Sequence, residues 1–390
     1  MKKEARDYLA AADVLRVISI GLIGWYHIWQ QSWLDPGFRM FGNYVNLQNV
    51  VRHGYMLVDV VLVISGFLLS LPYARVNLGL GEHPSTKQFY VKRFWRIIPS
   101  YLMAVLLCLF LWALPRHEYT SVSFMVKDLL THLTFTHNLT YYTYFMTPLQ
   151  IVLWTMGVEV QFYILFPLVA RFYEKTPGLT CLVLTLIAAL FRLRVYVMPD
   201  TTMWVNQLPC MLDLYAAGLA AGWIYTSASR RKISAGARWL MAGLALLCLL
   251  LILQLMYMGV IDDYDAVRRE QLALRLPLGM AAGAFLVCGC LAPPALNRVL
   301  GNPVVRFLSA VSYNFYMWHQ TLAVWLKELH LPAYTAELPN QAGEQPWQTR
   351  YTWLCFAAAL GAASLLTYLW ERPVNRWGLK RMGGTPKPSA

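Results

Sequence analysis

Two ionisable residues in the first long apolar stretch have a spacing that suits chemistry inside a membrane. Arg16 and His27 are 11 residues apart, close to three helical turns, so a helix carries both on one face. Helical rise separates them by about 16 Å along the axis, roughly half the hydrocarbon core. An imidazole takes up a proton near neutral pH, and a guanidinium stabilises developing negative charge. Together they predict that this helix face lines a passage within the membrane. Each alone is also typical of a snorkelling arginine or a histidine hydrogen-bonded between helices.

A pair of arginines marks the start of the third apolar stretch. Arg93 and Arg96 are three residues apart in the segment KRFWRIIP, residues 92–99, and share one face of a helix. Each guanidinium can donate two parallel hydrogen bonds to a phosphate. The pair predicts a phosphate-binding mouth at the membrane surface, with an anchor to lipid headgroups as the alternative.

Two later stretches carry polar side chains one helical turn apart. Glu159 and Tyr163 are four residues apart, and Ser312, Tyr316 and His319 follow one another at spacings of four and three. Each set forms a polar stripe on one helix face. Ionisable residues at membrane depth are costly and usually face a protein interior or a water-filled cavity. A glutamate there is equally typical of a structural partner for an arginine.

Other polar and sulfur-containing residues receive a structural interpretation. Asp59 is expected to hydrogen-bond between helices, and Asp213 and Glu371 are also interpreted as structural. All seven cysteines fall in apolar stretches and none forms a C-x-x-C pair, so neither a disulfide framework nor a metal site is expected. The nucleotide-binding, zinc-protease and serine-hydrolase motifs do not occur in a meaningful context.

The composition requires that these residues sit on membrane-spanning helices. Of the 390 residues, 58% are hydrophobic and only 14% are charged, against about 25% in soluble domains. The net charge of +13 lies mostly in short segments between apolar stretches, so it favours membrane orientation over nucleic-acid binding. An all-α, polytopic membrane protein is predicted, in the cell membrane. Its roughly ten spans are 13–31, 54–73, 94–114, 149–170, 178–199, 204–226, 237–259, 272–292, 304–326 and 351–370.

The distribution of lysine and arginine predicts the orientation of these spans. Connections on the N-terminal side carry about twice as many of these residues as the others, and Arg192 and Arg275 are counted with the others. Both termini are therefore expected in the cytoplasm, with the longer connections 32–53, 115–148 and 327–350 outside. The predicted organisation is a cytoplasmic segment 1–12, a membrane domain 13–375 and a cytoplasmic tail 376–390.

Six segments in this order resemble the membrane acyltransferase-3 family, and the resemblance covers about residues 13–375. The resemblance depends on the Arg16–His27 spacing and on the segments Val58–Leu68, Arg93–Pro99, Trp154–Tyr163, Ser312–His319 and Glu371–Pro373. Thr155 replaces the usual serine of the family motif, and the stretch Val60–Leu62 lacks the family's paired phenylalanine. Neither change removes a group with a proposed chemical role.

The resemblance implies acyl transfer from cytoplasmic acyl-CoA, most often acetyl-CoA, to a hydroxyl outside the cell. It makes His27 the catalytic base or acyl-relay residue and gives Arg16 a part in contacting the donor or an oxyanion. Arg93 and Arg96 would bind the CoA phosphates. Glu159 and His319 would orient His27 or the acceptor, and the substrate-orienting residues would be Tyr163, Ser312 and Tyr316.

The implied partners are acyl-CoA, the lipid bilayer and a cell-surface polysaccharide, related glycan or small hydroxyl acceptor, with no metal and no nucleic acid. The competing interpretation is a proton-coupled transporter or flippase that uses Arg16, His27, Glu159 and His319 as a proton relay. Transporters commonly contain inverted repeats and broken helices, and no matched halves are visible in this sequence.

Overall fold

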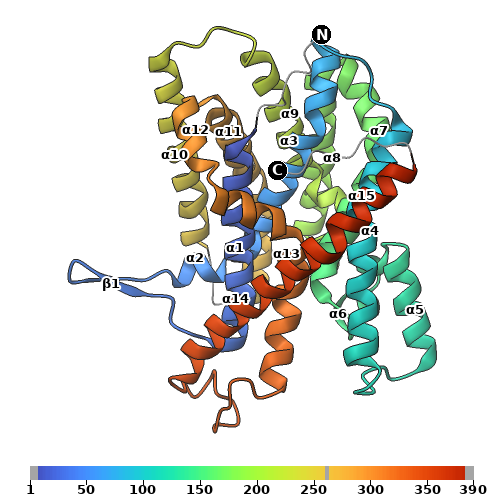
Figure 1. The fold of residues 1–390 in the computed structure, drawn as a ribbon, viewed down its shortest axis with the longest axis vertical. Coiled ribbons are helices and arrows are strands. Elements are labelled where there is room, and N and C mark those ends of the chain that lie inside the picture. Colours follow the sequence, from blue (N-terminus) through green and yellow to red (C-terminus); the bar gives the residue numbers. More distant parts are fainter. Residues whose placement is uncertain (1–7, 260–262, 383–390) are drawn as a thin grey trace.

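A computed structural model describes residues 8–259 and 263–382 and is almost entirely helical (Figure 1). Residues 1–7 of the expected N-terminal segment and 383–390 of the expected tail lie outside the described residues. The long helices are α1 (Ala10–Ser32), α3 (Leu57–Asn77), α4 (Thr86–Cys108), α7 (Trp154–Lys175), α8 (Pro177–Tyr196), α9 (Leu212–Ala228), α10 (Ala235–Tyr257), α11 (Tyr264–Leu291), α13 (Pro303–Glu328) and α14 (Trp347–Leu366).

Each of the ten predicted segments overlaps one of these long helices. Nine stretches of the described chain are long and apolar enough to cross a membrane. The tenth, α13, has 26 residues but is more polar than the others. Its polar side chains find partners on neighbouring helices: Asn314 Nδ2 donates to Glu371 Oε2 at 2.7 Å and to Thr367 Oγ1 at 2.8 Å. The all-α, multi-pass membrane fold is confirmed.

Several boundaries differ from the prediction. The sixth span begins at Leu212, after a short 3₁₀ turn η5 (Leu208–Met211), although the prediction includes residues 204–211. The third begins at Thr86, ahead of the predicted 94, and runs through a π-helical turn, η2 (Leu109–Ala113), to the predicted end. The last continues without a break from α14 through a second π-helical turn, η6 (Thr367–Glu371), into α15 (Arg372–Arg381), and this long helix crosses the front of the molecule diagonally in Figure 1.

The helix pairs α3–α9 and α1–α13 make extensive contacts. Gly66 of α3 and Gly218 of α9 face each other so closely that a Cβ on Gly218 would lie 2.3 Å from the Val63 carbonyl oxygen. Only glycine permits such a backbone approach. The helix α1 lies against α13 and α3, and α10 packs on α11 at one flank (Figure 1).

The predicted connections contain structure of their own. The 32–53 connection forms a two-stranded antiparallel hairpin, β1 (Phe38–Met40) and β2 (Asn43–Val45), which projects from the helices in Figure 1. The 115–148 connection folds into α5 (Val122–Leu133), a 3₁₀ turn η3 (His137–Leu139) and α6 (Tyr141–Phe145). The remaining short elements are α2 (Gln48–Arg52), η1 (Gly54–Met56), η4 (Ile151–Leu153) and α12 (Pro294–Leu300).

Two arginines that the sequence analysis counted with the connections are buried inside the helical core. Arg275 Nε donates to Asp59 Oδ2 at 3.2 Å, with both side chains almost fully buried. Arg192 pairs with Asp213, also buried. A single buried charge is unfavourable in a membrane, and a paired one is tolerated. Counting Arg192 and Arg275 as connection residues was therefore wrong, and removing them increases the predicted charge asymmetry between the two sides.

Candidate active site

The two histidines predicted inside the membrane are in direct contact. His27 of α1 and His319 of α13 approach to 2.8 Å between Nδ1 and Nε2. Gly24, one turn before His27, makes this contact possible because a Cβ there would lie 2.6 Å from the Phe315 ring. His319 is fully buried and His27 is half-buried. We call these two residues the histidine dyad.

The hydrogen bonds of the dyad determine where its protons reside when both rings are neutral. His319 Nδ1 faces the Phe315 carbonyl oxygen at 3.1 Å, and a carbonyl only accepts, so Nδ1 carries the proton. His319 Nε2 is then an acceptor, and His27 Nδ1 must donate to it. This leaves the lone pair of His27 on Nε2. The arrangement makes His27 Nε2 the basic atom of the dyad.

Arg16 lies on the same side of α1 as His27, since both reach α13. Its Nη1 donates to Asp13 Oδ1 and to Ser309 Oγ, each at 3.2 Å. Ser309 Oγ in turn donates to Asp13 Oδ1 at 2.7 Å. Neither Asp13 nor Ser309 was selected from the sequence, although Asp13 is three residues before Arg16 and therefore on the same helix face.

Glu159 of α7 forms a second polar group with residues of α3 and α4. Tyr163 donates to its carboxylate, and Ser65 Oγ donates to the same oxygen at 3.1 Å. The Arg93 guanidinium lies over the Tyr163 ring, 5.1 Å from its centre. A guanidinium on an aromatic face keeps its donors available at the ring edge. Arg93, Glu159 and Tyr163 therefore share one cluster.

Electrostatics connects this cluster to Arg16. Arg16 interacts with the charges of Arg96 and Glu159 and with Tyr163. Arg96 itself is exposed. Arg16 thus lies within electrostatic range of Arg96 and of the Glu159–Tyr163 pair, and the histidine dyad lies about three helical turns from Arg16 along α1.

Glu159 and Ser312 form hydrogen bonds outside the histidine dyad. Glu159 bonds to Tyr163 and Ser65 and is not hydrogen-bonded to His27, so its predicted role in orienting His27 lacks a direct contact. Ser312 donates to the Ser309 carbonyl of its own helix at 2.9 Å. Tyr316 remains beside the dyad, with its ring centre 5.6 Å from that of His319.

Two further features of the described residues bear on cofactors and pockets. No group of three or more histidine, cysteine, aspartate or glutamate side chains within 8–259 and 263–382 is arranged to hold a metal ion. A pocket at the far end of α1 is lined by Trp25, Asp35, Phe38, Trp353 and other mainly apolar residues. None of the predicted site residues lines that pocket.

The fold and this site agree with a family that the sequence can be matched to directly. Residues 9–371 match the model of the acyltransferase-3 family, described as an acyltransferase domain. The chain therefore belongs to the acyltransferase-3 family, and the predicted family and enzyme class are confirmed.

The chain is similar to several curated bacterial proteins. The peptidoglycan O-acetyltransferase OatA of Listeria monocytogenes is 25% identical over 343 residues, which cover 81% of this chain and 49% of that protein. YrhL of Bacillus subtilis is 21% identical, covering 83% of this chain and 50% of that protein. The O-acetyltransferase OatA of Staphylococcus aureus is 28% identical over 42% of this chain and 25% of its own length.

The chain thus spans about half the length of the first two relatives. No solved structure matches it.

Proposed function

We propose that this protein transfers an acetyl group from cytoplasmic acetyl-CoA to a hydroxyl of an extracytoplasmic cell-wall glycan. The observation that carries the proposal is the histidine dyad, because its hydrogen bonds leave an unprotonated imidazole nitrogen on His27. A fixed, half-buried base in the middle of a membrane enzyme suits proton removal from a hydroxyl.

The proposed reaction is a direct transfer with His27 as general base. His27 Nε2 takes the proton of the acceptor hydroxyl while the hydroxyl oxygen attacks the thioester carbonyl carbon of acetyl-CoA. The carbon–sulfur bond breaks, and the CoA sulfur takes the proton from the imidazolium, so the neutral dyad is restored. His319 accepts the hydrogen bond from His27 Nδ1 throughout and spreads the positive charge of the intermediate imidazolium.

The arginines support a phosphate-rich donor at the opposite end of the passage. Arg93 and Arg96 lie in the first half of α4 (Thr86–Cys108), and Arg16 lies within electrostatic range of Arg96. Three guanidiniums near one membrane face suit the phosphates of CoA. The excess of lysine and arginine on that side supports its assignment to the cytoplasm.

The names of the relatives support the acceptor and the acyl group that we propose. One relative is named a peptidoglycan O-acetyltransferase and another an O-acetyltransferase. An acetyl group and a peptidoglycan-like acceptor are therefore the substrates that we propose for this chain.

Proteoliposomes with acetyl-labelled acetyl-CoA sealed inside and a soluble peptidoglycan fragment outside test the proposal. Protease access to the Arg93 side identifies the vesicles in which that side faces the donor. We expect labelled ester on the outer fragment only in these vesicles. Product formed only when both substrates share one side would overturn through-membrane transfer. Release of intact acetyl-CoA to the outside would support the transporter alternative instead.

A further inference from the structure

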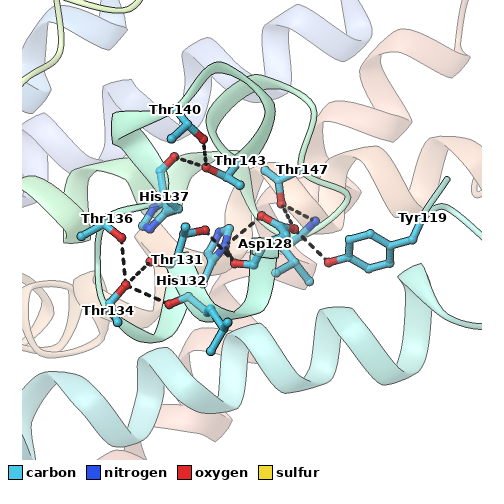
Figure 2. Close-up of polar contacts among 12 residues, drawn as sticks. Tyr119, Asp128, Thr131, His132, Thr134, Thr136, His137, Thr140, Thr143 and Thr147 are labelled. Carbon is cyan, nitrogen blue, oxygen red and sulfur yellow. Dashed lines mark hydrogen bonds and ion pairs between the residues drawn. The ribbon is translucent and has the colours of Figure 1, made fainter. Parts of the chain in front are cut away.

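The connection between α4 and α7 contains a buried polar cluster that the proposed reaction does not use (Figure 2). His132 of α5 and His137 of η3 stack face to face, with ring centres 4.1 Å apart and planes at 11°. Asp128 lies one turn before His132, and its Oδ1 is 3.2 Å from His132 Nδ1. Tyr119 and Thr147 donate to Asp128 Oδ2 at 2.9 and 2.8 Å.

The two imidazoles differ in their access to a negative charge. His132 has the Asp128 carboxylate beside it. His137 is 1% exposed, and its ring faces backbone groups at Thr131 and Leu153, which offset the effect of burial only in part. A proton on His137 would lie against the His132 ring, in a site without a carboxylate of its own.

The histidine pair lies against the face of α7 that carries Gly157 and Gln161. A Cβ on Gly157 would lie 3.4 Å from His137 Cε1 and 3.1 Å from Asn138 Oδ1. Gln161, one turn along α7, donates to Asn138 Oδ1 at 3.0 Å and to the Phe135 carbonyl at 2.9 Å. Because Glu159 lies between them in sequence, it points away from this face toward Ser65 of α3.

We propose that the stacked His132–His137 pair is a proton-sensitive clamp that positions α7, and with it Glu159 and Tyr163, only while His137 is neutral. We call α5, η3 and α6 together the α5–α6 unit. Acidification on the side of this unit would release the turn at η3, which holds Gly157 and Gln161. The inference rests on the proposed function for its effect on catalysis, since the proposed sidedness puts this unit in contact with the extracytoplasmic medium.

The direction of the pH effect follows from the two states of His137. Burial, together with the neighbouring His132, lowers the pKa of His137 to about 3 in the closed structure. Once the turn opens, the pKa returns to about 6.5. The closed state is therefore fully stable above about pH 6.5 and loses stability as the pH falls from there toward 3. Between pH 7.5 and 5.5 the opening equilibrium should rise about tenfold.

Several other titratable side chains surround the pair. Burial and Asp128 raise the pKa of Tyr119, so its phenol stays neutral. The helix α7 presents Gly157 and Gln161 to the pair. The titratable groups that face the cluster from the unit itself and from α4 are Asp128, Tyr119, Tyr101 and Cys108.

Hydrogen exchange of the full-length protein, without substrates, tests the clamp. After correction for the intrinsic pH dependence of exchange, wild-type peptides within 122–150 should exchange about tenfold faster at pH 5.5 than at 7.5. His137→Phe keeps a flat ring on His132 and cannot be protonated, so in this variant the same peptides should exchange equally fast at both pH values. His117→Asn, which removes an exposed histidine near the same unit, should behave as wild type.

Equal wild-type exchange at both pH values, or an equal acid response in His137→Phe, would overturn the proposal. If His137→Phe does not fold, deuterium exchange at the ring C2 position of His137 in the wild type reports its pKa directly. A value above 6 would also overturn it.

Transfer assays in proteoliposomes then test the effect on α7. Acid on the α5–α6 side should slow wild-type transfer more than that of His137→Phe, and an equal loss in both would overturn the positioning role. Absence of acyl transfer at every pH would contradict the proposed function and leave the exchange result unaffected.

Discussion

His27 and His319 are 292 positions apart in the chain, and their side chains meet at 2.8 Å. The contact joins the first long helix to α13 through a gap that Gly24 leaves for the Phe315 ring. Because the Phe315 carbonyl holds the proton of His319 on Nδ1, the backbone of α13 determines which nitrogen of His27 is basic. The dyad therefore ties the chemistry of α1 to the position of α13.

Replacing His27 should remove the base. His27→Gln should lower the rate of transfer by about 10²- to 10⁴-fold, which is the usual contribution of a general base. Acetyl-ester formation by the purified protein, with acetyl-CoA and a peptidoglycan fragment, measures it. The control is His117→Asn, which should retain wild-type turnover. Near-normal turnover of His27→Gln would exclude His27 as the base.

His319 should act by positioning His27, so the chemistry of its replacement matters. His319→Gln offers a carbonyl oxygen to His27 Nδ1, whereas His319→Leu offers no acceptor and leaves that donor unsatisfied. We expect the glutamine variant to retain at least about tenfold more activity than the leucine variant, in line with the ~1–3 kcal/mol cost of an unsatisfied buried donor. Equal loss in both variants would mean that His319 itself contacts substrate.

Arg93 and Arg96, in the first half of α4, should determine affinity for the donor. Arg93→Ala combined with Arg96→Ala should weaken acetyl-CoA binding at least about tenfold, because truncating one partner of a charged contact commonly costs 2 kcal/mol or more. Calorimetry in detergent measures the dissociation constant. Lys92→Ala, an exposed neighbour in the same turn, serves as the matched control and should bind normally. Unchanged affinity in the double variant would leave these arginines as membrane anchors.

The Asp59–Arg275 pair should contribute to stability through mutual compensation. Asp59→Ala leaves the Arg275 guanidinium buried without its carboxylate, which typically costs about 3–5 kcal/mol. Adding Arg275→Met should recover much of that loss. Thermal unfolding in detergent compares the three proteins. A double variant no more stable than Asp59→Ala alone would indicate that the Arg275 bonds to Asn206 and to the Val205 carbonyl matter more than the ion pair.

Helical period was enough to predict which residues share a face, and it could not predict partners on other helices. The spacing of Arg16 and His27 correctly indicated a common face toward one neighbour, since both contact α13. It carried no information on Asp13 and Ser309 as partners of Arg16 across two helices.

The same limit explains the errors. Arg275 was counted with a connection because a charge inside a span is unexpected until Asp59, 216 positions away, is known to lie beside it. His132 and His137 were overlooked because their stacking depends on the turn at residues 134–137, which lies in a segment interpreted only as a long connection.

The polarity of α13 affects how the protein is assembled. A segment this polar is a poor substrate for independent entry into the bilayer, because each polar side chain favours water until a partner helix is present. Its partners, α1 and α14, stand at opposite ends of the chain, so α13 gains its last hydrogen-bonding groups only when Thr367 and Glu371 have been synthesised. The helix that completes the dyad is thus among the last to settle. A nascent or truncated chain can hold Arg16 and the α4 arginines in the membrane well before it holds a competent base.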